Sequence, residues 1–131
     1  MAVLGLRQWK SHTFLILFEY FDGTSLDELL SSSSFSSEQK KAIFLQTLQG
    51  VAAAHKHNII HRDLKPGNIL VNAAGKVKLI DFGISKFKDR NITLSGSILG
   101  TMSYMAPEIT ALGVEVADAR SDIYSLGAYS L

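Results

Sequence analysis

The chain has 131 residues, a formal net charge of +1 at pH 7 and no cysteine. Its length suits one domain or part of one, and it is long enough to bury a sizeable core. The nearly balanced charge gives no support to a nucleic-acid partner or a polybasic membrane surface, and the lack of cysteine excludes a disulfide framework and a thiolate metal site.

Nothing in the sequence is typical of membrane insertion or secretion. The apolar run at residues 14–18 is far shorter than the ~20 residues that a membrane helix needs. No basic segment precedes an apolar one at Met1, so no signal peptide is expected. A cytoplasmic location without a membrane segment is therefore the default expectation.

The first predicted elements are two strands. Residues 3–9 read as a short strand, and residues 13–20 form a nearly continuous apolar run, typical of a strand buried on both faces. An acidic turn follows at residues 19–23. Residues 24–30 are then predicted as a short helix, and the Ser-rich residues 31–37 as a connector.

A long amphipathic helix is predicted from Glu38 to about His57. Ser36 can cap its start, and Gln39 completes a capping-box pattern. Because His55 and His57 are two residues apart, they do not share a face. We expect His55 near the core and His57 at the helix end, not a metal pair. The residues at helical spacing on the core face are Phe44, Leu48, Val51, Ala52 and His55.

The central motif is His-Arg-Asp-Leu-Lys-Pro-Gly-Asn at residues 61–68, with Asp-Phe-Gly at residues 81–83. Two short apolar runs lie between them, at residues 69–71 and 76–80. The second run alternates, and the turn at residues 72–75 contains Asn and Gly. This pattern predicts a β-hairpin.

A hairpin returns the chain to its starting point, so Asp63 and Asn68 at its entrance should meet Asp81 at its exit. Two carboxylates and an amide held together provide the oxygen ligands that Mg²⁺ prefers. The sequence therefore predicts a cation site at the open end of the hairpin.

The last third of the chain carries one more motif and one more helix. Residues 84–100 are long for a loop and carry several hydroxyls among basic residues. Residues 100–108 read Gly-Thr-Met-Ser-Tyr-Met-Ala-Pro-Glu. Residues 110–120 are predicted as a polar connector, and the helix after it should begin near Ser121 or Asp122.

These motifs, in this order, resemble the catalytic domain of eukaryotic-type serine/threonine protein kinases. The resemblance implies an α+β fold in which residues 1–131 form a partial kinase domain. Residues 1–20 would end the small lobe, and residues 21–131 would form the hinge and the first part of the large lobe. It also implies ATP-dependent phosphorylation of Ser and Thr hydroxyls on protein substrates.

The resemblance assigns catalytic roles to five residues. Asp63 would accept or orient the proton of the substrate hydroxyl, and Lys65 would steady the γ-phosphate. Asn68 and Asp81 would hold Mg²⁺ against the phosphates of ATP. Thr101 would contact Asp63 and Lys65 and favour Ser/Thr acceptors.

A nucleotide site is implied at the hinge. Phe18 would lie beside the adenine, whose edge would bond the backbone of Glu19 and Phe21. The resemblance adds further residues of the large lobe to this site: Lys65, Asn68, Leu70 and Asp81.

Other residues would organise or regulate the site. His61 would stack under Phe82, which precedes Gly83, and Asp122 would bond the backbone of the catalytic loop. Glu108 pairs in the family with an Arg far downstream, beyond the end of this chain.

A regulatory phosphate is also implied. Ser97 sits at the usual activating phosphosite, with Thr93 and Ser95 as alternatives, and its phosphate could pair with Arg62. The alternative is that these hydroxyls are solvated loop residues that are never modified.

The chain departs from the family pattern at its ends. It has no Gly-rich loop and no strand Lys with its helix Glu partner, which the kinase mechanism requires. We therefore expect a fragment or partial gene product, weak or inactive alone, that exposes the edge of its hinge strand and apolar residues of its last helix: Ile123, Tyr124 and Leu126.

Two alternatives stay open. One is a non-catalytic, pseudokinase-like binding module, against which the intact Asp63, Asn68 and Asp81 argue. The other is a small-molecule kinase of the aminoglycoside-phosphotransferase type, against which Asp-Phe-Gly and Ala-Pro-Glu argue.

Overall fold

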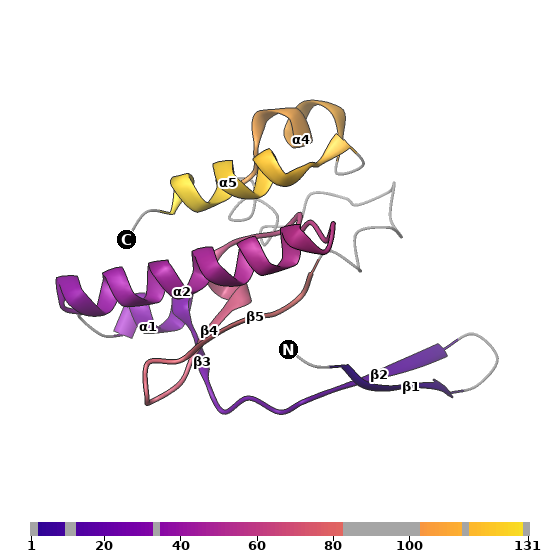
Figure 1. Ribbon diagram of the computed structural model, residues 1–131, viewed down its shortest axis with the longest axis horizontal. Helices are drawn as coiled ribbons and strands as arrows, with labels where there is room; N and C mark the ends of the chain where they lie inside the picture. Colours follow the sequence, from indigo (N-terminus) through magenta and orange to yellow (C-terminus); the bar gives the residue numbers. More distant parts are fainter. Residues whose placement is uncertain (1–2, 10–12, 33–34, 83–102, 114–115, 130–131) are drawn as a thin grey trace.

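The computed structural model describes residues 3–9, 13–32, 35–82, 103–113 and 116–129. Helices pack over a small sheet, and a two-stranded ribbon extends to one side of this body (Figure 1). The α+β fold is as predicted. Among the described helices, none is both long and apolar enough to cross a membrane.

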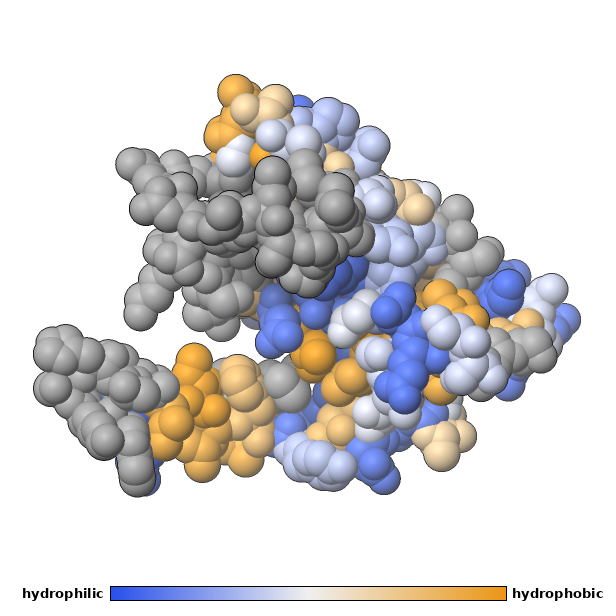
Figure 2. Space-filling view, turned by 180° about the vertical axis from the view of Figure 1, so that it is seen from behind, coloured by the Kyte–Doolittle hydropathy of each residue, from blue (hydrophilic) through white to orange (hydrophobic). Residues whose placement is uncertain are grey.

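Strands β1 (Val3–Trp9) and β2 (Thr13–Phe18) form the ribbon and pair antiparallel, with Leu6 opposite Ile16. The expectation that the second strand is buried on both faces is wrong, because residues 15–18 are all exposed, with Phe18, the least exposed of them, at 41%. An apolar run allows burial, but burial needs covering layers, and β1 is the only strand beside β2 among the described elements. Apolar surface gathers over this ribbon (Figure 2).

The second sheet has the strand order β3-β4-β5. Strand β3 is Thr24–Ser25, β4 is Ile69–Val71 and β5 is Val77–Leu79, and both pairings are antiparallel. The predicted hairpin is therefore confirmed. The helix predicted from residue 24 begins later, because Thr24 pairs with Val71 as a strand residue.

Helix α1 spans Leu26–Ser32 and extends two residues into the predicted Ser-rich connector. The side chain of Ser25 accepts a hydrogen bond from the N–H of Glu28 at 3.3 Å, which satisfies one of the free donors at the helix start. The hydroxyls of Ser31 and Ser32 donate to carbonyls four residues earlier, at 3.0 and 2.8 Å. These serines therefore complete the helix instead of ending it.

Helix α2 spans Ser37–Lys56, and the predicted capping box at its start is present. The N–H of Gln39 donates to the Ser36 hydroxyl at 3.2 Å, and the N–H of Ser36 donates to Gln39 Oε1 at 2.9 Å. Two backbone donors that the helix itself cannot satisfy are thereby paired.

The predicted core face of α2 is confirmed in part: Val51 is in the core, and Phe44 and Leu48 pack against it. Ile43, Thr47 and Val51 are its buried residues, four positions apart, whereas Ala52 is exposed. Thr47 tolerates burial because its hydroxyl donates to the carbonyl oxygen of Ile43 at 2.9 Å. A polar residue on the core face is hard to recognise from apolar spacing alone.

One core joins α2, the second sheet and the last helix. Its buried members are Leu26, Ile43, Val51, Leu64, Ile69, Val71, Leu79, Leu126 and Tyr129. The expected exposure of Leu126 is wrong, because this residue faces that core and is only 2% exposed. Ile123 and Tyr124 are exposed, as predicted.

Helices α4 (Pro107–Leu112) and α5 (Ala119–Ala128) replace much of the predicted polar connector. Pro107 occupies the first turn of α4, where its missing N–H costs nothing. Helix α5 begins before the predicted start because Asp118 is its N-cap, and Ser121 completes a capping box. The Asp118 carboxylate accepts from the N–H of Arg120 at 2.8 Å.

Candidate active site

The segment that carries the central motif begins at the end of α2. The N–H of Asn58 donates to the carbonyl of His55 and the N–H of Ile59 to that of Ala54, both at 3.0 Å. Asn58 has a φ of 58°, so the helix ends in the left-handed turn that reverses the chain. This turn directs residues 61–68 back across the body.

Within this loop, Asp63 is the centre of a polar cluster. Nδ2 of Asn68 donates to the Asp63 carbonyl oxygen at 2.7 Å and to its Oδ2 at 3.2 Å. Nζ of Lys65 lies 3.4 Å from the same Oδ2. A short 3-10 helix, Pro66–Asn68, makes the turn that brings Asn68 back to Asp63. Three of the predicted site residues are therefore in contact.

The hairpin brings the backbone of Asp81 next to this cluster. The N–H of Ile80 donates to the carbonyl oxygen of Asn68 at 3.0 Å, which fixes the residue before Asp81 beside Asn68. Asp81 itself is exposed and has a φ of 55°. A non-glycine residue in this region costs about 1–3 kcal/mol and is most frequent at functional sites. The hairpin thus brings Asn68 and Asp81 together, as the sequence predicts.

The chemistry of this end of the hairpin fits Mg²⁺. Because Nδ2 of Asn68 donates to Asp63, its Oδ1 is the amide atom left to coordinate a cation, and the exposed Asp81 can supply a carboxylate oxygen. Among the described residues there is no group of three or more His, Cys, Asp or Glu side chains that could hold a metal. A site with one amide and one carboxylate needs further oxygen ligands, and phosphates and water usually supply these to Mg²⁺.

His61 links the loop to the strand before Asp81. Its Nε2 donates to the carbonyl oxygen of Ile80 at 2.9 Å, so in the neutral ring Nδ1 is free to accept from the N–H of Asp63, 3.4 Å away. Its ring lies 4.5 Å from that of Phe82, at an angle of 41°. Burial lowers the pKa of His61, and this outweighs the opposite effect of Asp122 and other nearby carboxylates. The stacking with Phe82 is the contact that the resemblance implies.

The buried carboxylate of Asp122, on α5, holds the backbone of the loop. Oδ2 accepts from the N–H of His61 at 2.8 Å, and Oδ1 accepts from the N–H of Arg62 at 2.9 Å. Arg62 has a φ of 67°, a strained value for a residue with a side chain. Asp122 therefore fixes the two residues before Asp63, which is the contact that the resemblance implies.

Glu108 has a partner within the described chain. The hydroxyl of Ser121 donates to Oε1 of Glu108 at 2.7 Å, and the same hydroxyl accepts from the N–H of Asp118 at 3.3 Å. The residue after Ser121 is Asp122. This contact therefore joins the start of α4 to the first turn of the helix that carries Asp122.

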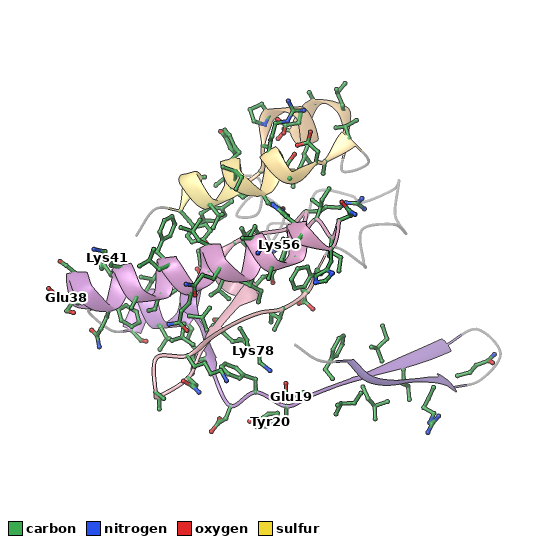
Figure 3. All side chains as sticks on the ribbon, viewed as in Figure 1. Glu19, Tyr20, Glu38, Lys41, Lys56 and Lys78 are labelled. Atoms are coloured by element: carbon green, nitrogen blue, oxygen red, sulfur yellow. The ribbon has the colours of Figure 1, made fainter. Side chains whose placement is uncertain are left out.

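The predicted hinge residues contact β5. Lys78 forms an ion pair with Glu19, and its Nζ lies 5.4 Å from the centroid of the Phe21 ring (Figure 3). The hydrogen bond from Lys78 lowers the pKa of the Glu19 carboxyl. Leu70 pairs with Lys78 across β4 and β5, so both lie on the face of the sheet opposite to Ile69. The structure thus brings Leu70 to the same side as the hinge.

The match to a known family covers almost the whole chain. The profile of the family described as "Protein kinase domain" matches residues 4–131. This chain belongs to that family. The resemblance to a protein kinase catalytic domain is therefore confirmed.

Relatives named as protein kinases align with most of this kinase domain. It is 38% identical, over 97% of its length, to the probable serine/threonine-protein kinase pknA2 of Bifidobacterium longum. It is 42% identical, also over 97%, to the serine/threonine-protein kinase PknL of Mycobacterium tuberculosis. Mitogen-activated protein kinase kinase 2 of Arabidopsis thaliana is 42% identical over 86% of the chain. The chain spans 17%, 32% and 31% of the lengths of these three relatives, in the same order.

Some predicted residues of the kinase domain lie outside the described residues. These are Gly83, Thr93, Ser95, Ser97 and Thr101. Their roles in the active site and in activation stay predictions, and so does the pairing of Arg62 with a phosphate.

Two residues of the kinase domain have contacts that the sequence did not predict. The alternation of residues 76–80 puts Lys78 on the face opposite to Leu79 without naming a partner, and the helical spacing puts His55 only near the core. In the structure Nε2 of His55 lies 2.8 Å from Oδ2 of Asp122. The position of His55, four residues after the buried Val51, indicates that His55 faces the core. This spacing does not identify Asp122 as its partner.

Proposed function

We propose that this chain provides the catalytic loop and hinge of an ATP-dependent kinase that phosphorylates Ser and Thr hydroxyls on proteins. The observation that carries this proposal is the cluster of Asp63, Lys65 and Asn68 at the open end of one hairpin, with the backbone before Asp81 bonded to Asn68. It combines a carboxylate, an ammonium group and two oxygen ligands for a cation. Phosphoryl transfer needs these groups in place, because the protein contributes mainly positioning and charge neutralisation.

In this proposal Asp63 accepts the proton of the substrate hydroxyl. Its Oδ2 lies near Lys65 Nζ at 3.4 Å, which keeps the carboxylate in a fixed environment. Lys65 binds oxygen atoms of the phosphoryl group that is transferred. Asn68 and Asp81 would hold Mg²⁺, which neutralises charge on the phosphates of ATP when it is bound.

The hinge completes the proposed nucleotide site. The backbone of Glu19 and Phe21 would bond the adenine edge, and Leu70 lies on the face of the sheet that Lys78 shares. The ion pair between Lys78 and Glu19 holds this segment against β5, so the hinge backbone is placed before the nucleotide arrives. We assign residues 1–20 to the small lobe and the remainder to the hinge and large lobe.

The proposed acceptor is a Ser or Thr of a protein. The names of the relatives in Bifidobacterium longum and Mycobacterium tuberculosis support it, because both are called serine/threonine-protein kinases. Lys65, two residues after Asp63, supports the same class. We further propose that the protein acts in the cytoplasm.

The test compares three Asp to Asn substitutions in the chain: Asp63, Asp81 and, as control, Asp27 on the exposed side of α1. Binding is measured as the rise in melting temperature with Mg²⁺ and ATP, and transfer as radiolabel on a generic basic protein. We expect Asp81→Asn to lose the rise in melting temperature. Asp63→Asn should keep it but lose at least about 100-fold in transfer, and Asp27→Asn should resemble the parent chain.

Different failures lead to different conclusions. A parent chain whose melting temperature does not rise with Mg²⁺ and ATP would favour a non-catalytic binding module, whereas binding with weak or no transfer is what a chain without the strand Lys should show. A parent chain that labels an aminoglycoside but not protein would favour a small-molecule kinase. Equal transfer by the parent chain and Asp63→Asn would show that Asp63 is not the base.

A further inference from the structure

A pocket lies at the turn end of the β4–β5 hairpin, opposite to the end that carries the predicted cation ligands. Its walls come from the first half of α2, from Leu29 and Phe35 on either side of the α1–α2 connection, and from the hairpin turn (Figure 1). Ile43 and Val71, both buried, also line it. The volume is about 540 Å³, which is within the range of small-molecule sites in proteins.

The lining of this pocket is neutral. None of the described residues that line it is charged, and most of them are apolar. Leu29 and Phe35 pack against the core but are only half-buried, so part of each side chain is left for a ligand. A charged group that entered would lose water without gaining a counter-charge. The pocket therefore favours a neutral, mainly apolar ligand.

Two side-chain amides in the lining add a preference for a hydrogen-bond acceptor. Oε1 of Gln39 accepts from the N–H of Ser36 at 2.9 Å. Oδ1 of Asn72 accepts from the N–H groups of Ala74 and Lys76, at 3.0 and 2.9 Å. Because both oxygens are occupied, the amide nitrogens are the atoms left to a ligand, and these nitrogens donate. A suitable ligand therefore carries an acceptor such as a carbonyl oxygen.

The turn offers little to a peptide that would bind by adding a strand. The N–H of Asn72 donates to the carbonyl oxygen of Lys76 at 3.0 Å, and that of Gly75 donates to the carbonyl oxygen of Asn72 at 2.9 Å. The N–H of Val77 donates to Oε1 of Gln46. Strand addition needs such groups for main-chain hydrogen bonds. Since these donors are occupied, the pocket fits a small molecule better than a protein segment.

A ligand in this pocket would contact the hairpin that positions the predicted cation ligands. Val71 pairs with Val77 across β4 and β5. At the other end of the hairpin, the N–H of Ile80 donates to the carbonyl oxygen of Asn68 at 3.0 Å. Each strand has only three residues. Contacts that hold the turn against α2 therefore also steady the end that carries Asn68 and Asp81.

We propose that this pocket is a regulatory site for a neutral, mainly apolar small molecule with a hydrogen-bond acceptor, and that its occupation stabilises the β4–β5 hairpin. The effect on nucleotide binding rests on the proposed function, in which Asn68 and Asp81 hold Mg²⁺. The occupation of the pocket and its effect on the hairpin do not depend on that function, so both are measured without nucleotide.

The first experiment titrates the 131-residue chain with acetanilide, an uncharged molecule with an aromatic ring and a carbonyl acceptor. The amide chemical shifts of Phe35, Gln46 and Val71 report on the pocket, and those of Leu15 and Ile16 report on the exposed apolar ribbon. We expect saturable shifts at the pocket alone, with a Kd on the order of 1 mM. Benzoate, which has the same ring and a negative charge, should bind at least about tenfold more weakly.

Matched variants test the place and the chemistry of binding. Ala42→Phe fills the pocket from α2, and Ala53→Phe adds the same ring at an exposed position of that helix outside the pocket. Gln39→Glu keeps the acceptor for Ser36 but removes the donor, and Gln49→Glu adds the same charge at an exposed control position. Ala42→Phe and Gln39→Glu should each weaken acetanilide binding at least about fivefold. Both control variants should bind like the parent chain.

Several results would overturn the proposal. They are the lack of saturable shifts at the pocket, equal shifts at the ribbon, benzoate binding as tight as that of acetanilide, and equal binding by Ala42→Phe and the parent chain. If Ala42→Phe does not fold, Ala74→Phe fills the pocket from the turn and decides instead. Pocket shifts that depend on protein concentration without acetanilide would assign the pocket to a second copy of the chain, and would also overturn the proposal.

The second experiment measures the effect on the hairpin. The amide hydrogen exchange of Ile80 is compared with that of Asn58, which donates to His55 in the turn at the far end of α2. Saturating acetanilide should slow exchange at Ile80 relative to Asn58 at least about fivefold. An unchanged ratio would overturn the regulatory part of the proposal.

A third measurement separates this proposal from the proposed function. If Mg²⁺ and ATP bind at the other end of the hairpin, reciprocity requires that they tighten the binding of acetanilide. An unchanged Kd for acetanilide in the presence of bound nucleotide would overturn the coupling. A chain that binds no nucleotide would refute the proposed function, whereas the titration and the exchange ratio would still decide the role of the pocket.

Discussion

His61 donates from Nε2 to the carbonyl oxygen of Ile80 at 2.9 Å, which joins the first residue of the catalytic loop to the residue before Asp81. The two segments are separated in sequence by the whole hairpin. The hairpin brings them close, and this hydrogen bond fixes their distance. The neutral imidazole makes a second contact through Nδ1, which accepts from the N–H of Asp63.

This geometry predicts a pH dependence of stability. Burial lowers the pKa of His61 from its ordinary value of 6.5, so near that pH the unfolded chain binds a proton that the folded chain does not. The free energy of unfolding should therefore be highest above pH 6.5 and fall as the pH decreases toward the lowered pKa. Urea denaturation between about pH 5 and pH 8 measures this change.

Substitution separates His61 from the other histidines. His61→Phe keeps the stacking on Phe82 without a titrating group, so it should be less stable but should lose much of the slope with pH. His57→Gln, at the exposed end of α2, should keep the slope. An equal slope in His61→Phe and the parent chain would contradict this assignment.

Gln46 is predicted to determine the stability of the hairpin. Its Oε1 accepts from the N–H of Val77 at 3.1 Å, and its Nε2 donates to the carbonyl oxygen of Gly75 at 2.9 Å. Gln46→Ala removes both bonds and should lower the free energy of unfolding by about 1–3 kcal/mol. Gln49→Ala, on an exposed position of the same helix, is the matched control and should change it by less than about 0.5 kcal/mol. Chemical denaturation measures both, and equal losses would contradict the role of Gln46.

The parts of this fold that the sequence predicts are those with local causes. The hairpin follows from alternation around an Asn/Gly turn, and the start of α2 follows from Ser36 and Gln39, three residues apart. The approach of the Asp81 backbone to Asn68 then follows from the hairpin. Each of these inferences needs only neighbouring residues and one turn.

The parts that the sequence does not predict depend on distant partners. His55 and Asp122 are 67 residues apart, and Lys78 and Glu19 are 59 residues apart. The exposure of Phe18 and the burial of Leu126 depend on which layers cover them, which an apolar pattern does not state. The early start of α5 is different, since Asp118 and Ser121 form a local capping box that neighbouring residues alone specify.

Gly23 should be required for the close packing of the hinge. A Cβ at this position would lie 2.6 Å from Cε1 of Phe21 and 3.2 Å from the carbonyl carbon of Val71. Gly23→Ala should therefore displace the Phe21 ring and destabilise the chain by about 1–3 kcal/mol. In Gly127→Ala, on α5, no atom lies within 4 Å of the added Cβ, and it should instead stabilise by about 0.4–1 kcal/mol. Thermal melts of both variants measure this, and a neutral Gly23→Ala would show that the ring moves without cost.

The last prediction concerns the ion pair between Lys78 and Glu19. Lys78 lowers the pKa of the Glu19 carboxyl by a hydrogen bond and by its charge, and Lys76 adds a smaller effect of the same sign. Lys78→Met should therefore raise the pKa of Glu19 toward 4.5, and Lys76→Met should raise it less. An NMR titration of the Glu19 side chain measures both shifts. Because Lys78 also lies over Phe21, Lys78→Met should in addition speed amide exchange in residues 19–23. Equal pKa shifts in the two variants would mean that Lys78 acts only as a distant charge and does not hold the hinge.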